Sequence, residues 1–267
     1  MRNWSLAIAL VGIVASAALL HAQVGPSAPQ LYERGLNALA GTGASHNDTA
    51  AVDYFRKSAS QGYPPAQVAL GFLYDTGTII AREPQQAADW YKKAALQDDR
   101  LGQWLLGRLI YNGDITRDLN ESTKWLQKAA GHGDPFGQYL LGMVKLERQD
   151  YPQAAVWFRK AAMQGLPQAQ QQLGLLLKQG QGVTLDKSEA YVWLLMSSEA
   201  GNLTVTNDLQ ALEGDLGTNQ VEQAKSKAHE LQQTATRAVV AKGCMGWSGE
   251  FNPVPSPPPI DLQSFCR

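Results

Sequence analysis

Five near-copies of one short phrase constrain this chain more than any other feature of its sequence. They read "AVDYFRKSA", "AADWYKKAA", "STKWLQKAA", "AAVWFRKAA" and "AYVWLLMSS". The aligned aromatic residues are Tyr54, Trp90, Trp125, Trp157 and Trp193, at separations of 36, 35, 32 and 36 residues. A period of this length predicts a stack of similar units, none of which can bury its apolar face alone.

A second phrase keeps step with the first. Its glycines, which lie 15 to 19 residues before the aromatics, are Gly35, Gly71, Gly107, Gly142 and Gly174, and four of them follow a leucine. Each unit therefore has two segments, here called A and B. In segment B the apolar or small residues have helical spacing, as in Ala87, Trp90, Tyr91 and Ala94. In segment A the apolar stripe runs through residues such as Ala66, Leu70 and Leu73, so both segments are predicted to be helices.

Residues that suit helix ends flank each predicted B helix. Seven positions before the aromatic, where an oxygen-bearing side chain can accept from the first amides, stand Asn47, Glu83, Asp118, Asp150 and Asp186. Eight positions after the aromatic, where the chain can turn left-handed, stand Gly62, Gly133, Gly165 and Gly201, with Asp98 in the second unit. The sequence thus predicts helix A, a turn, helix B and a linker, repeated five times.

The combined pattern "AQxxLGxxY" followed by "AxxWYxKAAxxG" resembles the Sel-one-like repeat family, which is related to the tetratricopeptide repeats. The resemblance covers residues 28–201 and implies an all-α, right-handed α-solenoid of about five helix-turn-helix repeats. The expected units are residues 28–62, 63–98, 99–133, 134–165 and 166–201. The fourth linker is short, and the last unit replaces the Lys-Ala-Ala phrase by Met196, Ser197 and Ser198.

Beyond Gly201 the pattern changes. Residues 202–242 are expected to form a helical cap on the stack, with Asn219 and Glu222 as a capping box at the start of a long helix. Residues 243–267 are rich in proline and glycine and predict an irregular or polyproline tail. Its Cys244 and Cys266 are the chain's only cysteines, and we expect a disulfide between them, with two unpaired thiols as the alternative.

The first residues are typical of an export signal. Arg2 precedes an apolar run from Leu6 to Leu20, and small residues follow it, so residues 1–22 are interpreted as a signal peptide. The expected location is periplasmic or secreted. An uncleaved membrane anchor is the alternative, and it is the one way in which we expect the protein to contact a membrane.

Charge and motifs exclude several classes of function. A formal net charge of -1 offers no basic surface for nucleic acid. Some bacterial proteins of the family are linked to β-lactam binding or hydrolysis, but the Ser-x-x-Lys, Ser-Asp-Asn and Lys-Thr-Gly motifs of such enzymes are absent. Phosphate-binding and zinc-protease motifs are absent too, so we predict no catalytic residue, metal or cofactor.

One face of helix A is less polar than a solvated face should be. Three positions of helix A point away from the expected core: two before, two after and five after the leucine. Units two to five have twelve residues at these positions, and eight of them are apolar or aromatic. In units two to five they are Val68, Phe72, Asp75; Trp104, Arg108, Tyr111; Tyr139, Met143, Leu146; and Gln171, Leu175, Lys178.

The resemblance implies that helix A lines the concave side of the solenoid, where partner proteins and peptides bind. The candidate partner-binding residues are Phe72, Trp104, Arg108, Tyr111, Tyr139 and Met143. The favoured hypothesis is therefore an exported, non-catalytic scaffold that binds a protein or an extended peptide. The alternatives are a β-lactam-binding or hydrolysing enzyme of the cell wall, a membrane-anchored regulator, and burial of the same stripe by tight curvature or by the tail.

Overall fold

The computed structural model describes residues 25–41 and 46–242 of the chain, and within them every regular element is helical. The A helices are α2 (Ala28–Ala40), α4 (Pro64–Thr76), α6 (Arg100–Asn112), α8 (Pro135–Glu147) and α10 (Pro167–Gln179). The B helices are α3 (Asp48–Ser60), α5 (Pro84–Leu96), α7 (Leu119–Gly131), α9 (Tyr151–Ala162) and α11 (Lys187–Glu199). A short 3-10 turn (Leu203–Val205), α12 (Thr206–Asp215) and α13 (Thr218–Lys242) follow. The predicted all-α solenoid is confirmed.

The B helices begin where the sequence predicted. Asn47, Asp118, Asp150 and Asp186 each accept a hydrogen bond from a backbone amide of the first turn, whereas Glu83 makes no such bond. The residues after each B helix adopt the expected positive φ, between 81° and 94° at the four glycines and 66° at Asp98. Asp98 can replace glycine because a short polar side chain tolerates this conformation better than most.

Within each unit the A-helix glycine lets the B helix approach. A Cβ atom added to Gly142 would lie 2.6 Å from a ring carbon of Phe158, and the other four glycines face their B helices in the same way. The facing residues, all at most 1% exposed, are Phe55, Tyr91, Leu126, Phe158 and Leu194. The deepest residue of each B helix is therefore the one after the aligned aromatic.

The aligned aromatics themselves have another place. Trp90, Trp125 and Trp157 are half-buried, and Trp90 packs against a core cluster formed by the first two units. A lysine lies over each ring, with Lys93 Nζ 3.5 Å from the ring centre of Trp90 and equivalent lysines over the other two. Each of these tryptophans therefore packs partly on the core and makes a cation–π contact with a lysine of its own helix.

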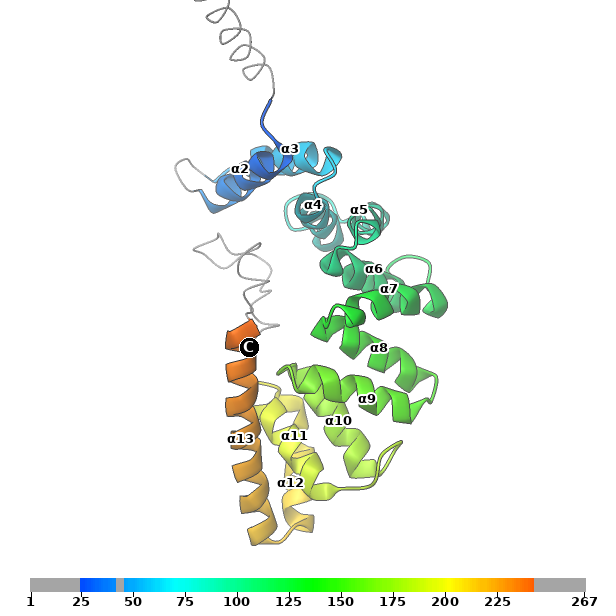
Figure 1. Ribbon diagram of the computed structural model, residues 1–267, viewed down its shortest axis with the longest axis vertical. Helices are drawn as coiled ribbons and strands as arrows, with labels where there is room; N and C mark the ends of the chain where they lie inside the picture. The colour runs from blue at the N-terminus through cyan, green and yellow to red at the C-terminus, as the bar shows by residue number, and fades with distance from the viewer. Residues whose placement is uncertain (1–24, 42–45, 243–267) are drawn as a thin grey trace, which may run out of the picture.

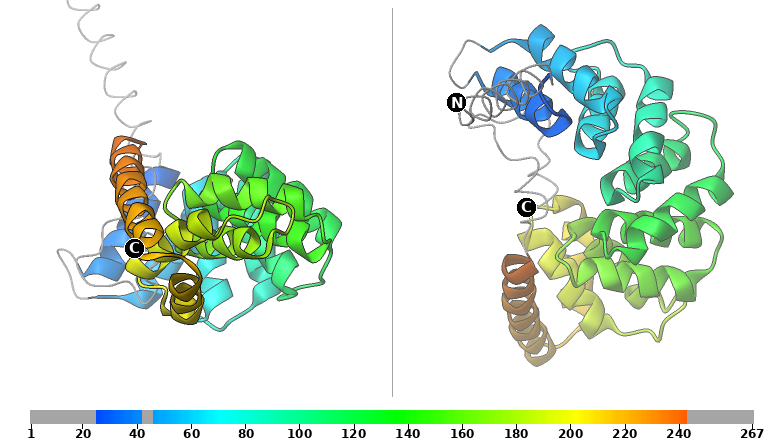
Figure 2. Two further views of the ribbon diagram at one scale, coloured as in Figure 1. Left: turned by 90° about the horizontal axis from the view of Figure 1, so that it is seen from below. Right: turned by 45° about the horizontal axis from the view of Figure 1, so that its top comes forward.

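The stack curves toward its A helices. Helices α4 and α6, and likewise α6 and α8, contact each other directly, while no two successive B helices among the described residues make comparable contact. Because neighbouring units meet more closely on the A side, the A helices must lie inside the curve. Figures 1 and 2 show the resulting arc, which is open on the side where α13 lies.

Helices α12 and α13 close the C-terminal end of the stack. Helix α13 packs against α11 and buries Val221, Ala224 and Ala228, and the hydroxyl of Tyr191 donates to Glu213 of α12 at 2.6 Å. The predicted capping helix is confirmed, but the predicted capping box is wrong. The helix begins two residues earlier than that box requires, at Thr218, and Gln220 accepts from the amide of Gly217 instead.

Two predicted segments lie outside the described residues. They are the signal peptide (1–22) and the tail (243–267) with its proposed disulfide between Cys244 and Cys266. Both stay predictions. Among the described helices, none combines the length and the apolar character needed to cross a membrane.

Candidate functional site

The candidate site is the inner wall of the arc, formed by one face of each A helix. Of the six residues selected from the sequence, Phe72, Arg108, Tyr111, Tyr139 and Met143 are half-buried. Two further apolar residues of the same face, Leu146 and Leu175, are half-buried as well. We define the inner strip by its apolar members: Phe72, Tyr111, Tyr139, Met143, Leu146 and Leu175.

Trp104 is the exception, and the prediction that it stands open on this wall is wrong. It is only 6% exposed, and its ring stacks on Phe136 of α8 with the ring centres 5.2 Å apart. Val68, at the equivalent position of α4, is 2% exposed. The physical reason is the curvature, because closely approaching A helices bury the positions between them. Trp104 therefore contributes to packing between units three and four.

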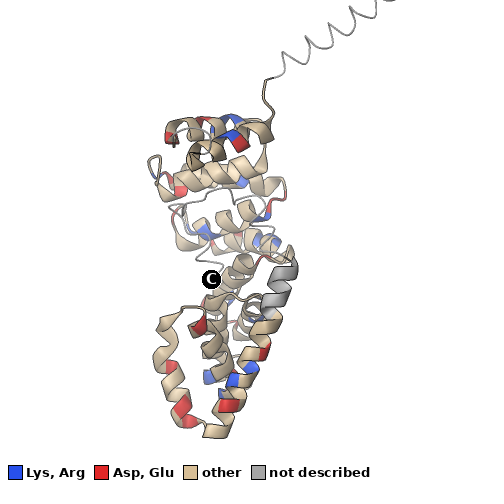
Figure 3. Ribbon diagram, turned by 90° about the vertical axis from the view of Figure 1, so that its left-hand side faces the viewer, with Lys and Arg blue, Asp and Glu red and all other residues tan. Residues whose placement is uncertain are grey.

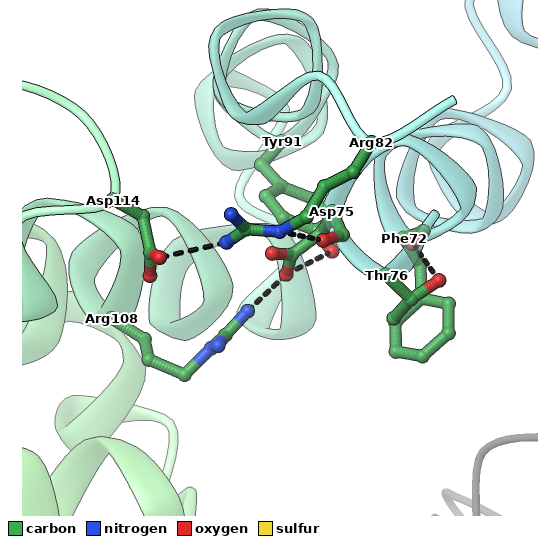
Figure 4. A network of polar contacts seen from close by, with 7 residues as sticks. All are labelled: Phe72, Asp75, Thr76, Arg82, Tyr91, Arg108 and Asp114. Carbon is green, nitrogen blue, oxygen red and sulfur yellow. Dashed lines mark hydrogen bonds and ion pairs between the residues drawn. The ribbon is translucent and has the colours of Figure 1, made fainter. Parts of the chain in front are cut away.

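A charged network closes the wall between units two and three (Figure 4). The carboxylate of Asp75, which is 6% exposed, accepts from the guanidinium of Arg108 and, at 3.3 Å, from the hydroxyl of Tyr91. Arg82 donates to the backbone oxygen of Asp75 at 2.8 Å and to Asp114 at 2.7 Å. Burial, with the nearby Asp75 carboxylate, raises the pKa of Tyr91, so this hydroxyl stays a donor.

The network neutralises Arg108, which the sequence had selected as a polar contact for a ligand. At the other end of the wall, Lys178 of α10 donates to Asp208 of α12 at 2.8 Å. The two cations of this face are therefore already paired. Figure 3, which faces the open side of the arc, shows charges of both signs scattered along the ribbon.

Between these two ion pairs the wall is apolar. Tyr139 stands 5.9 Å from Phe158, centre to centre, and Met143 and Leu146 follow it on α8. Burial raises the pKa of both Tyr111 and Tyr139, so their hydroxyls remain protonated. The arrangement offers aromatic and aliphatic surface with two protonated hydroxyl groups.

A row of buried glutamines on the A helices was not predicted from the sequence, and two of them join their A helix to the B helix before it. The row consists of Gln67, Gln103, Gln138 and Gln170, none more than 6% exposed. The side chain of Gln67 donates to the backbone oxygen of Ala59 at 3.2 Å, and Gln170 does the same to Ala162 at 3.3 Å. The signal was present in the sequence, since a glutamine precedes each leucine-glycine pair by three residues, but a polar residue was not expected in the core.

Asp134 is a buried carboxyl that was also missed. It is 1% exposed and begins α8, where its Oδ1 accepts from the amide of Gly137 at 2.8 Å. Its Oδ2 has no hydrogen-bond partner among the described residues. Burial raises the pKa of Asp134 to about 6, against the opposing effect of the Gly137 amide and the charge of Arg100.

Other kinds of site find little support in the described part of the chain. No group of three or more histidine, cysteine, aspartate or glutamate side chains there is placed to hold a metal ion. A hollow of about 500 Å³ opens at the first unit, between the start of α2 and residues such as Tyr54 and Lys57 of α3. No residue of the inner strip lines it.

Comparison with known proteins agrees with this architecture. The model of the Sel1 repeat matches residues 23–63, 64–99, 100–134, 135–166 and 167–202. The chain belongs to the Sel1 repeat proteins. Proteins of this family are in general scaffolds for protein interaction.

Two solved structures share the fold. One is a protective antigen of uropathogenic Escherichia coli that displays an SLR fold, with 29% identity and a TM-score of 0.75 over 86% of this chain and 50% of that one. The other is a Sel1 repeat protein from Oxalobacter formigenes, with 38% identity and a TM-score of 0.60 over 70% of this chain and 55% of that one. This chain therefore spans about half the length of each.

Proposed function

We propose that this Sel1 repeat protein is an exported, non-catalytic scaffold that binds a protein or an extended peptide along the inner strip. The observation that carries the proposal is the apolar stretch of Tyr111, Tyr139, Met143, Leu146 and Leu175 between two neutralised charge pairs. A half-exposed apolar surface of this kind, bordered by polar groups, is what a binding surface requires. Export is supported by the sequence of residues 1–22.

A matched pair of double variants tests the binding surface. Met143→Glu with Leu175→Glu introduces two carboxylates into the inner strip. Met163→Glu with Leu185→Glu makes the same changes at residues that are 60% and 55% exposed outside the strip. The tagged proteins are expressed in the native host, and partners captured from an envelope extract are compared by quantitative mass spectrometry.

The first variant should lose its specific partners at least tenfold, because a buried, unpaired carboxylate opposes binding by more than about 1.4 kcal/mol. The control should retain them. Equal partner lists for the wild type and the first variant would show that the strip is not the binding surface.

Two further measurements address the other parts of the proposal. Labelling with a fluorescent penicillin should give no covalent adduct, whereas a labelled band that excess unlabelled penicillin removes would favour the β-lactam-binding alternative. Fractionation with N-terminal sequencing should place a chain shortened by about 22 residues in the periplasm or medium. A full-length chain in the membrane fraction would favour the anchored regulator.

A further inference from the structure

The tail carries an apolar pattern that the repeats do not explain. Within "FNPVPSPPPI", residues 251–260, the apolar residues Phe251, Val254, Pro257 and Ile260 recur every third position. A proline-rich segment favours the polyproline II conformation, which has three residues per turn and a rise of about 3.1 Å per residue. In that conformation the four residues share one face and lie about 9 Å apart along it.

Successive A helices of the stack are expected to repeat at a similar distance. Helices α4, α6, α8 and α10 each contribute one residue two positions after the leucine, and these residues are Phe72, Arg108, Met143 and Leu175, of which the paired Arg108 is not part of the inner strip. Packed neighbouring helices lie about 8–10 Å apart. An apolar face with a 9 Å repeat can therefore place one residue against each successive A helix, which a β-strand with its repeat of about 7 Å would not do.

The distribution of charge also favours binding of residues 251–260 to the inner wall. Residues 251–260 contain no ionisable side chain. The cations of the wall, Arg108 and Lys178, are already paired with Asp75 and Asp208. An uncharged ligand thus leaves both ion pairs intact, while the half-exposed Tyr111 and Tyr139 provide the aromatic surface that polyproline II ligands use.

The described chain ends in a suitable place. Helix α13 leaves its C-terminal end at Lys242 on the open side of the arc (Figures 1 and 2). Phe251 follows Lys242 by nine positions in the sequence. An extended segment of that length spans up to about 30 Å, which sets how far from the end of α13 residue 251 can lie.

We infer that residues 251–260 bind to the inner strip of their own chain as a polyproline II segment. The inference rests on the proposed function, since it takes the inner strip to be a binding surface, and it names the chemistry of the ligand. A tethered segment acts at an effective concentration in the millimolar range, so a partner must displace it. The tail thereby restricts binding to partners that present a stronger extended, proline-rich sequence.

Methionine methyl resonances provide the test, because three of the chain's five methionines lie among the described residues, each in a different environment. Met143 lies in the inner strip, Met163 is 60% exposed outside it, and Met196 is 3% exposed in the core. The full chain is labelled with methyl-¹³C methionine, and Met143→Leu assigns the strip resonance. Two tail variants are compared with the wild type in the full chain: Phe251→Ser with Val254→Ser and Ile260→Ser on the proposed face, and Asn252→Ser with Ser256→Ala off it.

The on-face variant should shift the Met143 methyl resonance, and the off-face variant should leave it at the wild-type position. Met163 and Met196 should stay unchanged in both. A synthetic peptide of residues 249–262, added to the on-face variant, should return the Met143 resonance toward its wild-type position. An unmoved Met143 resonance, or an equal shift in both variants, would overturn the inference.

Dilution separates binding within one chain from binding between two. A resonance that stays constant on tenfold dilution, with a monomeric elution volume, supports the intramolecular contact. A concentration-dependent shift would place the tail on a second copy and overturn it. If the Met143 resonance is unchanged in the on-face tail variant while Met143→Glu with Leu175→Glu still removes captured partners, the tail inference fails and the proposed function stands. If neither the tail variant nor the double glutamate variant has an effect, both fail.

Discussion

Equivalent positions of successive A helices are charged at the two ends of the inner wall and apolar in its middle. At each junction between units, we compare the residue five positions after the leucine of one A helix with the residue two positions after the leucine of the next. Between units two and three these residues are Asp75 and Arg108. The same positions hold Tyr111 and Met143, then Leu146 and Leu175, across the next two junctions. Lys178 then pairs with Asp208 of the cap.

The comparison teaches that one backbone arrangement serves two purposes. At the ends, the positions are used within the molecule, because each charge finds its partner one unit away. In the middle, the side chains at the same positions are apolar and are only partly buried by the other described residues. The side chains at these positions differ between the junctions, so substitution can test whether one kind of junction converts into the other.

The largest effect is expected from opening the ion pair between units two and three. Arg108→Met leaves the buried Asp75 carboxylate with the Tyr91 hydroxyl alone, and loss of one partner of a buried pair costs about 3 kcal/mol. The double variant Asp75→Leu with Arg108→Met makes this junction apolar like the middle ones and should recover most of that loss. Urea unfolding measures both.

A matched control is Arg117→Met, which breaks an exposed pair with Glu147. It should change stability far less than Arg108→Met, because exposed ion pairs are weak. Equal losses for the two single variants, or no recovery in the double variant, would mean that the charged junction gains nothing from its burial.

The middle of the wall has a buried charge of its own at the start of α8. Asp134 has a pKa of about 6 in the folded chain and about 3.8 when unfolded. The folded state binds the proton of the Asp134 carboxyl more tightly than the unfolded state does. The stabilisation that this proton provides is therefore fully present below pH 3.8 and is lost as the pH rises through 6. Asp134→Asn keeps a hydrogen-bonding cap and should raise the unfolding free energy at pH 7.5 by at most about 3 kcal/mol, with little change at pH 4.

Asp118→Asn is the control with the opposite sign. Amide hydrogen bonds from Glu121 and Asn120 lower the pKa of Asp118. The stabilisation that its ionised carboxylate provides is therefore present at neutral pH and is lost on acidification. Urea unfolding at the two pH values should therefore show Asp118→Asn less stable than the wild type at pH 7.5. If both variants respond to pH in the same direction, the assignment of burial at Asp134 is wrong.

A smaller effect is expected within the fourth unit, which carries the apolar middle of the wall. Gly142→Ala places a methyl group 2.6 Å from the Phe158 ring, and such overpacking costs about 2 kcal/mol. Gly131→Ala, which meets nothing within 4 Å, should stabilise by about 0.5 kcal/mol through helix propensity. Thermal unfolding compares them, and equal effects would mean that the glycine is not needed for close packing.

The smallest effect concerns the outer side of the same units. Lys93→Met removes the cation over Trp90 and should cost about 0.5 kcal/mol, since the contact is exposed. Lys92→Met, on the neighbouring exposed position, is the control. Chemical denaturation of the two variants should differ by this amount, and identical midpoints would show that the cation–π contact does not stabilise the fold.

Local signals in the sequence were enough to predict the fold. The period of about 35 residues, the caps at Asn47, Asp118 and Asp186, and the left-handed turns all follow from neighbours along the chain. The helical period also placed Tyr139 and Met143 on a face of α8 that is partly exposed among the described residues. These features need no knowledge of how one unit rests on the next.

The errors arise where two units meet. Trp104 points away from its own core, yet the close approach of α6 and α8 buries it against Phe136. Arg108 was selected as a polar contact for a ligand, and its ion pair with Asp75, 33 residues earlier in the sequence, was not predicted. Curvature decides both, and the spacing within one repeat does not contain it.

Site-specific photocrosslinking tests most directly the central claim that the apolar middle of the inner wall binds a ligand. The photoreactive amino acid p-benzoylphenylalanine replaces either Met143 in the inner strip or Met163 on the outside, and cells expressing each variant are irradiated. We predict crosslinks from position 143, to a partner or to residues 251–260, and none above background from position 163. Crosslinks from position 163 alone would contradict the account.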